Sequence, residues 1–439
     1  MPHPTAERIV IIGGGAGGIV LATELGHKLG KRGLAEITLI DKHLTHIWKP
    51  LLHEVAAGSL NSYTDELNYF AHARKHHFRF LPGELSAINR EQQQISLNES
   101  RDSTGTIILP ARELGYDRLI IAIGSVCNDF NTTGARDNCL FMDSRQQAEY
   151  FHQLLIGRYL QAQRRDEKNQ HLDICIVGAG ATGVELSAEL HHTARTLNRY
   201  GLDAIDAQQV RITLVEAAPR ILPALPEAMA EAAHEELEAM GVRIFAGEKV
   251  TAIDPQALHT ASGKVIDADI KVWSAGIKAP DFLRAIAGLE TTPGNQLIVR
   301  DTLQTSRDEK IFALGDCASL TIKNANGDML RIPPRAQSAY QQAKLLAKSL
   351  SAQIQHGTAL QAFSYKDHGS LVSLSTENTV GNLMGNLFGT INIEGFIARM
   401  MYMMLYRMHQ AALHGWPTTV LIMCRDLINR GTGPRLKLH

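Results

Sequence analysis

Short apolar runs alternate with helical patterns along most of the chain, which is typical of an α/β protein. Residues 8–12 (RIVII) predict a buried strand, which a glycine-rich turn, a helix and a second strand over 36–41 (EITLID) follow. The same order returns at 172–177 (LDICIV), where another glycine-rich turn and a helix lead to a strand over 210–216. The pattern therefore predicts two βαβ units.

Further elements surround these two units. Short strands with polar turns are expected between residues 78 and 109, and 48–60 reads as an irregular loop that leads into a helix. The remaining predicted elements are strands over 116–124, 271–276 and 310–316 and helices over 144–168 and 334–353.

Composition narrows the function classes. The 439 residues suffice for two to three domains, and a net charge of -1 gives no reason to expect nucleic acid as a partner. The five cysteines form no CxxC or CxxxxC pair, so we expect a reducing compartment rather than a disulfide framework. Neither a secretory signal nor an apolar run long enough to span a membrane is recognisable.

The first glycine turn has the spacing of a dinucleotide-binding loop. Gly13 permits a tight turn, Gly15 lets the backbone approach a pyrophosphate, and Gly18 lets helix and strand pack closely; Gly17 belongs to the same loop. Asp41 ends the next strand, where a carboxylate accepts hydrogen bonds from ribose hydroxyls. A glycine turn without function is the alternative, and the strand–turn–helix context disfavours it.

The second glycine turn repeats this chemistry with Gly178, Gly180 and Gly183. Glu216 ends the following strand, and its charge would bind a ribose diol and repel a 2′-phosphate. We therefore expect NADH to be preferred over NADPH, although Arg220 is a weak signal in the other direction. Two such loops indicate two dinucleotides, normally a resident flavin and a nicotinamide that exchanges.

The turn at Gly124 and the run Leu314-Gly315-Asp316 add to the two glycine turns, Asp41 and Glu216. With these features the chain resembles the pyridine-nucleotide flavin oxidoreductases from residue 8 to about 350. The resemblance implies two Rossmann-like domains, one FAD per chain and NADH as substrate. It also implies that Asp316 binds the ribityl and pyrophosphate region of the flavin. Gly276, Gly315 and Ala336 are expected to line the cofactor sites.

A narrower resemblance rests on 333–341 (PPRAQSAYQ), which contains the AQxAxQ quinone-site motif of the type II NADH:quinone oxidoreductases. The stretches WKPLLHEVAAGSL, TLVEAAPRILP, YKDHGSLVSLS and the ending GPRLKLH are similar to the bacterial members of that family. Gln337 and Gln341 lie one helical turn apart, so both amides can face a quinone. Two amides that cap a helix or face solvent are the alternative.

Glu185 lies two residues after Gly183, near the start of the second fingerprint helix. The family resemblance suggests that it delivers protons near flavin and quinone. The alternative is an acid that only complements the helix dipole. No metal, catalytic nucleophile or proton-pumping apparatus is indicated.

The resemblance divides the chain into four parts. We expect a FAD-binding domain over 1–150 and 291–365, an NADH-binding domain over 151–290 and a membrane-associated region over 366–439. Disulfide reductases and sulfide:quinone reductases of similar fold need a pair of reactive cysteines. This sequence has no CxxC or CxxxxC pair, which argues against both classes. Ferredoxin-type reductases would not need the apolar tail, and a non-catalytic NADH sensor would not turn over quinone.

The tail differs in composition from the rest of the chain. Helical stripes of apolar residues are predicted over 396–413 and 416–428, both of which contain arginine. From residue 396 onward the chain has six basic residues and one acid, which are Arg399, Arg407, Arg425, Arg430, Arg435, Lys437 and Asp426. We expect two amphipathic helices that lie on a phospholipid bilayer, peripheral to the cytoplasmic face of a bacterial inner membrane. A core contact or a homodimer contact is the alternative.

Overall fold

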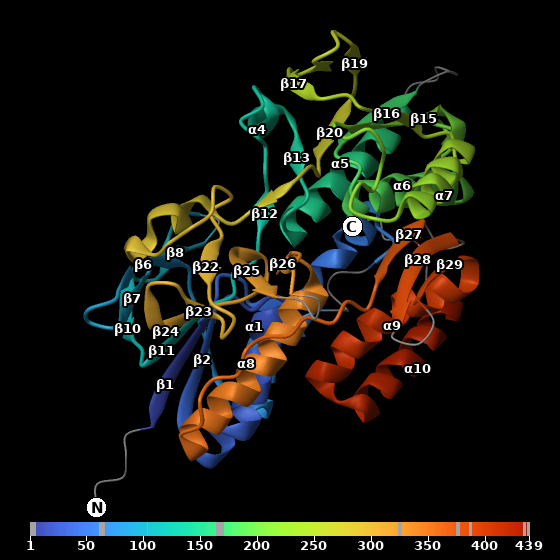
Figure 1. Cartoon of the computed structure of the whole chain (residues 1–439). Helices are drawn as coiled ribbons and strands as arrows, with labels where there is room; N and C mark the ends of the chain where they lie inside the picture. The colour runs from blue at the N-terminus through green and yellow to red at the C-terminus, as the bar shows by residue number, and fades with distance from the viewer. Residues whose placement is uncertain are drawn as a thin grey trace, which may run out of the picture. The chain divides into compact units, whose positions relative to one another are not determined.

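The computed structural model describes residues 6–60, 66–102, 104–163, 171–323, 327–374, 378–385, 389–432 and 436. The chain forms two compact units (Figure 1). The first comprises Met1–Ile47, Glu66–Val126 and Ile277–Lys366, and the second comprises Trp48–Asp65, Cys127–Gly276 and Asp367–His439. Each unit contains one of the two βαβ repeats, and each is described by itself below.

The first unit is built on a nine-stranded sheet in which the five strands at one end, in the order β24-β11-β1-β2-β5, are parallel. The predicted repeat appears as β1 (Glu7–Ile12), α1 (Ala16–Lys28) and β2 (Ala35–Asp41). Helix α8 (Ala336–His356) packs along α1, and Figure 1 shows the two side by side in orange and blue. The apolar run of β1 is buried, because both faces of a parallel sheet are covered.

The other elements of this unit are short. The remaining strands of the large sheet are β5 (Arg79–Pro82), β11 (Arg118–Ile121), β22 (Leu297–Val299), β23 (Gln304–Thr305), β24 (Asp308–Ala313), β25 (Ala318–Lys323) and β26 (Met329–Arg331). A second sheet, which is antiparallel, contains β6 (Leu85–Asn89), β7 (Gln94–Leu97) and β10 (Arg112–Gly115). Smaller elements are β3 (Thr45–His46), β4 (Leu67–Asn68), α3 (Tyr69–Lys75), β8 (Ser100–Arg101), β9 (Ile107–Leu109) and β21 (Ile277–Lys278).

The second unit is built on a five-stranded parallel sheet. Its strands, in order, are β13 (Leu140–Phe141), β20 (Ile270–Trp273), β14 (Leu172–Val177), β15 (Val210–Glu216) and β16 (Arg243–Ala246). Its helices include α2 (Leu52–Ala57), α4 (Ala135–Asn138), α5 (Arg145–Gln163), α6 (Ala181–Arg199) and α7 (Glu227–Ala239). A small antiparallel sheet is formed by β17 (Val250–Ile253), β18 (Ala257–Thr260) and β19 (Val265–Asp267).

The C-terminal part belongs to the second unit. It begins with an antiparallel sheet of β27 (Ser370–Leu374), β28 (Asn378–Gly385) and β29 (Gly389–Glu394), which the sequence pattern did not predict. The two expected helices are present as α9 (Gly395–His414) and α10 (Trp416–Thr432). Figure 1 shows them beside β28 and β29, and α9 contacts β28. Within the described residues no helix is long and apolar enough to cross a membrane.

The observed strands have the predicted bounds at 172–177 and 210–216, where the apolar runs are long. Other observed bounds differ from the prediction. The strand expected over 116–124 ends at Ile121, because the backbone then turns towards Gly124, which has φ +73°. The ends of two predicted features, the helix over 144–168 and the GPRLKLH ending, fall partly outside the described residues.

Candidate dinucleotide-binding sites

The first glycine turn is tight at two positions and open at a third. Gly13 has φ +98°, and a Cβ there would lie 2.4 Å from the carbonyl oxygen of Ala122. A Cβ on Gly18 would lie 1.9 Å from the carbonyl oxygen of Gly13. Nothing lies within 4 Å of the corresponding position on Gly15. The turn therefore needs glycine for its own fold at Gly13 and Gly18, whereas the space at Gly15 fits a pyrophosphate.

Asp41 holds the first turn in place. Its Oδ2 accepts a hydrogen bond from the N–H of Gly14 at 2.7 Å, and its Oδ1 accepts one from the N–H of His43 at 2.8 Å. The Gly14 carbonyl in turn accepts a hydrogen bond from the buried Tyr69 hydroxyl at 2.7 Å and lies 2.9 Å from His46 Nδ1. Because a carboxylate has about four acceptor positions, Asp41 can also accept bonds from ribose hydroxyls.

The second glycine turn repeats this geometry. Gly178 has φ +99°, and a Cβ on Gly183 would lie 2.0 Å from the carbonyl oxygen of Gly178. Glu216 Oε2 accepts a hydrogen bond from the N–H of Ala179 at 2.7 Å, and Oε1 accepts one from the N–H of Ala218 at 2.8 Å. The two acids thus have equivalent places at the ends of β2 and β15.

Both fingerprint helices begin without a side-chain cap. The N-caps of α1 and α6, both fully described, are Gly15 and Gly180, and neither has a side-chain cap hydrogen bond. The first N–H groups of a helix attract anions, so these two helix starts suit a pyrophosphate.

Arg220 is committed to the backbone of its own loop. Its guanidinium donates to the carbonyl oxygens of Leu222 at 3.1 Å, Pro223 at 3.3 Å and Leu225 at 2.8 Å. These bonds orient the group along the loop, so it is a poor candidate for binding a 2′-phosphate beside Glu216.

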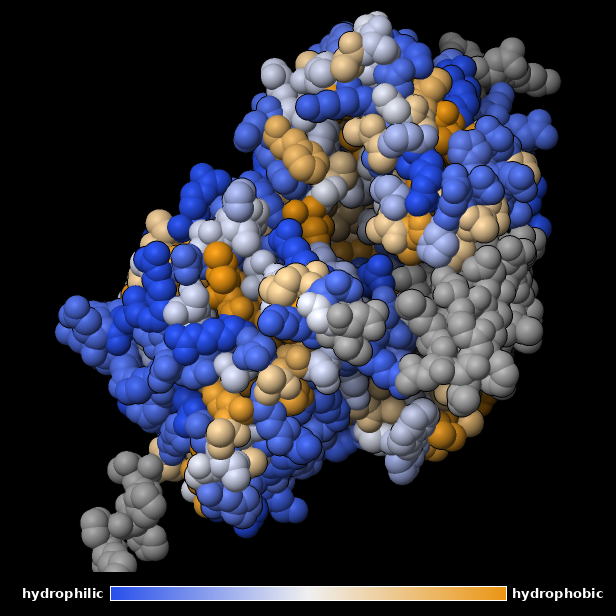
Figure 2. All heavy atoms as spheres, in the orientation of Figure 1, coloured by the Kyte–Doolittle hydropathy of each residue, from blue (hydrophilic) through white to orange (hydrophobic). Residues whose placement is uncertain are grey.

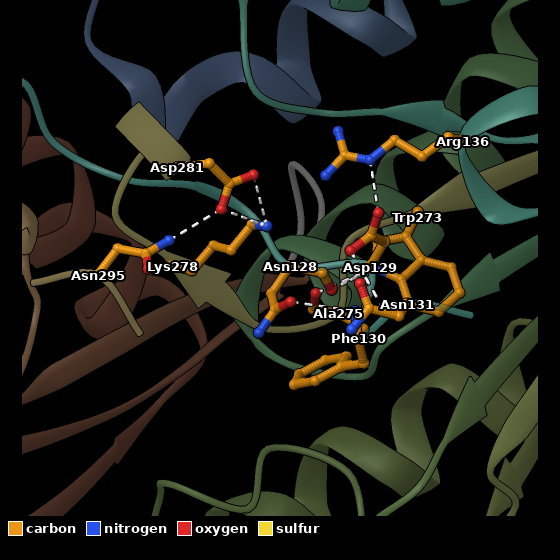
Figure 3. Close-up of polar contacts among 10 residues, drawn as sticks. All are labelled: Asn128, Asp129, Phe130, Asn131, Arg136, Trp273, Ala275, Lys278, Asp281 and Asn295. Atoms are coloured by element: carbon orange, nitrogen blue, oxygen red, sulfur yellow. Dashed lines mark hydrogen bonds and ion pairs between the residues drawn. The ribbon is translucent and has the colours of Figure 1, made fainter. Parts of the chain in front are cut away.

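Two loop segments of the second unit meet just after β20, one at Asn128–Asn131 and one at Ala275–Gly276 (Figure 3). The buried indole of Trp273 donates to the carbonyl oxygens of Asn128 at 2.9 Å and Ala275 at 3.2 Å. Gly276 has φ +61°, and a Cβ there would lie 2.4 Å from the ring of Phe130, which is an exposed side chain. The pattern of the sequence gave no signal for Phe130.

The Gly-Asp turn of the first unit is fixed by two side chains. Asp316 Oδ2 accepts a hydrogen bond from the Ser125 hydroxyl at 2.8 Å, which joins this turn to the residue after Gly124. The N–H of Gly315 donates to Gln342 Oε1 at 2.7 Å, and Gln342 is buried on α8. Sequence reasoning missed Gln342, although it follows directly after Gln341 in the AQSAYQQ run.

The quinone-site motif opens helix α8. Ala336 is the first helical residue, Gln337 lies in the first turn and is partly buried, and Gln341 lies one turn later. The Gln341 amide donates to the carbonyl oxygen of Lys366 at 2.8 Å and accepts from its N–H at 3.1 Å. Gln341 therefore holds the chain that follows α8, which is a structural role; its contact with quinone stays a prediction.

Glu185 lies inside the second unit, on the fifth position of α6, and is only 6% exposed. Its Oε2 lies 3.4 Å from Nδ1 of His53 on α2. Burial lowers the pKa of His53 to about 4, so the ring is neutral at physiological pH. The helix-dipole alternative does not account for this partner, and the sequence gave no role to His53.

Cysteines and metal-ligating residue types form neither a disulfide nor a metal-binding cluster among the residues that the structure describes. All five cysteines are free, and burial raises the pKa of the Cys139, Cys175 and Cys317 thiols to about 12. Among the residues that the structure describes, no group of three or more His, Cys, Asp or Glu side chains is placed to hold a metal ion.

Comparison with known proteins gives the class. The sequence pattern of the pyridine nucleotide-disulphide oxidoreductases matches residues 7–343, so the chain belongs to that family. Within it, the chain is 45% identical over 449 residues to the type II NADH:quinone oxidoreductase of Haemophilus influenzae, covering 99% of this chain and 100% of that one. It is 27% identical to the enzyme of that name from Staphylococcus aureus, over 86% of this chain and 90% of the relative. The chain is thus a member of the type II NADH:quinone oxidoreductases.

Solved structures share the fold. NDH2 from Plasmodium falciparum, solved in complex with NADH, superposes with a TM-score of 0.81 at 19% identity over 98% of this chain and 100% of that one. The sulfide:quinone oxidoreductase of Aquifex aeolicus superposes with a TM-score of 0.73 at 17% identity over 93% and 92%. At these identities the likeness shows the fold alone, and it confirms the predicted α/β class.

Proposed function

We propose that this chain oxidises NADH with one bound FAD and passes the electrons to a membrane quinone without pumping protons. The observation that carries the proposal is the pair of equivalent glycine turns, each held by the acid that ends the next strand. Two such turns in one chain fit two dinucleotides. The five cysteines are free and four of them are buried, so disulfide reduction is not favoured as the task of the second dinucleotide.

FAD fits the first unit. The open position at Gly15 and the uncapped start of α1 suit a pyrophosphate, which FAD has and FMN lacks. Asp41 would bind the adenosine ribose, and Asp316 would bind the ribityl and pyrophosphate region. When bound, a flavin would accept hydride from a nicotinamide and, with one further proton taken up from solvent, would supply two electrons and two protons to a quinone. The flavin domain expected over 1–150 and 291–365 overlaps this unit, although residues 48–65 and 127–150 belong to the second unit.

NADH fits the second unit. Gly180 leaves room for the pyrophosphate, and Glu216 favours a free ribose diol over a 2′-phosphate. The assignment of 151–290 to NADH rests on this turn. Gly276 and the turn against it would border the nicotinamide end, because ligands of such sheets bind beyond the carboxyl ends of the strands.

The quinone is assigned to the start of α8. Gln337 and Gln341 can donate to a carbonyl oxygen, and Glu185 is the buried acid that we assign to proton transfer. The family relationship supports both assignments.

A membrane surface is proposed for α9 and α10. Large apolar side chains with at least 44% exposure recur on the described positions of these helices, namely Met404, Met408, Trp416, Val420, Leu421, Met423 and Ile428. Figure 2 shows hydrophobic surface at the lower edge over these helices. Arg407 forms an ion pair with Asp426 at 2.8 Å that joins α9 to α10, so this arginine braces the two helices. We assign the protein to the cytoplasmic face of a bacterial inner membrane, as a peripheral protein.

One experiment tests the core of the proposal. The purified protein should be yellow, NADH should bleach it without oxygen, and a quinone analogue should restore the colour. Mass spectrometry of the released cofactor should identify one FAD per chain. A colourless protein with a normal fold, or a flavin that NADH does not bleach, would falsify the proposal.

A further inference from the structure

Helices α2 and α6 are held together by a buried hydrogen bond. The Thr193 hydroxyl on α6 donates to the carbonyl oxygen of Ala57, the last residue of α2, at 3.0 Å. This bond fixes the two helices within the second unit and thereby sets which side chains meet between them. One turn back along α2, His53 meets Glu185 of α6.

Both members of this pair are buried. His53 is 2% exposed and Glu185 is 6% exposed, and the nearest atoms, Nδ1 and Oε2, are 3.4 Å apart. A buried carboxylate needs hydrogen-bond donors, because an unpaired charge in the protein interior is costly. The His53 ring is neutral at physiological pH and therefore offers one N–H.

Two other acceptors lie near the ring. The carbonyl oxygen of Pro50 is a competing acceptor for this single N–H, and Glu54 Oε1 lies 4.0 Å from Nε2. An anionic carboxylate is a stronger acceptor than a neutral carbonyl, and Glu185 is closer than Glu54. The elements packed against α2 carry further titratable or charged groups, which are Lys49 before it, Arg145, Glu149, Tyr150, His152, Arg158 and Tyr159 on α5, and Glu189, His191, His192, Arg195 and Arg199 on α6. Of these, His152, Tyr159 and Glu189 are buried.

We propose that His53 is a positioning residue for Glu185: its neutral ring donates a hydrogen bond to the carboxylate, holds it in one orientation and stabilises its ionised form. This inference rests on the proposed function, in which Glu185 transfers protons during quinone reduction. The histidine acts through the acid and needs no contact with flavin, NADH or quinone.

The test uses the flavin-loaded full-length protein and the pH dependence of quinone-analogue reduction. Glu185→Gln should remove one limb of the profile, which assigns that limb to Glu185. His53→Leu removes the donor, so the ionised form loses support and the limb should move to higher pH by about one unit. His53→Gln keeps a side-chain N–H and should restore most of the wild-type profile. His191→Leu, which changes a partly buried histidine on α6, is the control and should leave the limb in place.

An unmoved or downward-shifted limb in a flavin-loaded His53→Leu protein overturns the inference, as does a profile that Glu185→Gln leaves unchanged. If His53→Leu does not fold, reduced-minus-oxidised infrared spectra of the wild type and of the smaller donor-free variant His53→Ala decide. The carboxyl band that Glu185→Gln abolishes should shift in His53→Ala, and an unshifted band overturns the inference. Loss of NADH bleaching or quinone recolouring in the wild type would instead overturn the proposed function.

Discussion

The carboxylate of Asp41 accepts a hydrogen bond from the N–H of Gly14 at 2.7 Å, and this bond ties the end of β2 to the first glycine turn. Glu216 makes the same bond to Ala179 at 2.7 Å in the second unit. Each acid therefore shapes the loop beside it as well as offering acceptor positions to a ribose. Substitutions at these acids should change both loop stability and nucleotide choice, and the experiments have to separate the two effects.

Alanine at the two helix-start glycines of the second unit should have opposite consequences. At Gly183 a Cβ would lie 2.0 Å from a backbone oxygen, so Gly183→Ala should unfold the unit or lower its thermal midpoint strongly. At Gly180 a Cβ meets nothing within 4 Å, so Gly180→Ala should fold with flavin but raise the KM for NADH about tenfold. Thermal unfolding and steady-state kinetics give the two answers. A normal KM in Gly180→Ala would mean that no pyrophosphate approaches there.

Replacing Glu216 should weaken the preference for NADH. Glu216→Gln keeps an acceptor for the loop but removes the charge that repels a 2′-phosphate, so kcat/KM for NADH should fall and that for NADPH should rise. Glu216→Ser should do the same with a larger loss of loop stability, because it cannot reach Ala179. Glu238→Gln, which alters an exposed acid on α7, is the control. If the unmodified protein already prefers NADPH, the role given to Glu216 is wrong.

Local chemistry explains how much the sequence could predict. The strands over 172–177 and 210–216 were placed correctly, because long buried apolar runs bordered by glycine have few other solutions. Helix α3 was missed, although Asn68 is an N-cap whose side chain accepts from the N–H of Ala71 at 3.0 Å. That signal was present in the sequence, but a helix of seven residues is too short to show a repeating apolar stripe.

The partners of polar side chains could not be predicted. The amide of Gln341 pairs with the backbone of Lys366, and the ring of His53 meets Glu185, which is far away in the sequence. Spacing places a residue on a face of its helix, but only the tertiary packing decides what lies opposite that face. For the same reason the role of Gln342 could not be predicted, because it depends on the tertiary contact between its side chain and the N–H of Gly315.

Substitutions of three glutamines on α8 should distinguish a role in quinone reduction from a role in flavin binding. Gln342→Leu leaves the N–H of Gly315 without its partner, so it should destabilise the protein by about 1–3 kcal/mol and weaken flavin binding. Gln337→Leu should slow quinone reduction and leave NADH bleaching nearly intact. Gln341→Leu should do the same and also free the backbone at Lys366, which limited proteolysis would detect. Equal damage to both half-reactions by Gln337→Leu would mean that this amide only supports the fold.

Thiol reactivity should follow burial. Burial raises the pKa of four cysteine thiols, so at pH 8 these groups stay protonated and covered, and only the exposed Cys424 should react. A chromogenic disulfide reagent should titrate one thiol in the native protein and five after denaturation. Fast reaction of a second thiol that NADH accelerates would contradict this prediction and revive a disulfide-reductase function.

The exposed apolar side chains of α9 and α10 should mediate membrane attachment. Leu421 and Ile428 are 70% and 66% exposed, so aspartate at both positions costs little folding energy but opposes insertion into a bilayer. The double variant should bind anionic phospholipid vesicles at least about tenfold more weakly while keeping its flavin. Ile108 and Val265 are 62% and 59% exposed in strands outside this region, and aspartate at both is the matched control that should leave binding unchanged.

Truncation before Phe396 should also release the protein from membranes, but it removes α9 from its contact with β28 and can unfold its neighbours. The substitutions are therefore the cleaner test, and sedimentation of the same variants resolves the remaining alternative. If the apolar stripe is a homodimer contact, the Leu421→Asp/Ile428→Asp protein should become monomeric in solution while its vesicle binding stays normal. If it faces the bilayer, its mass in solution should not change and vesicle binding should fall. Attachment that survives both the truncation and the double substitution would place the membrane contact elsewhere on the chain.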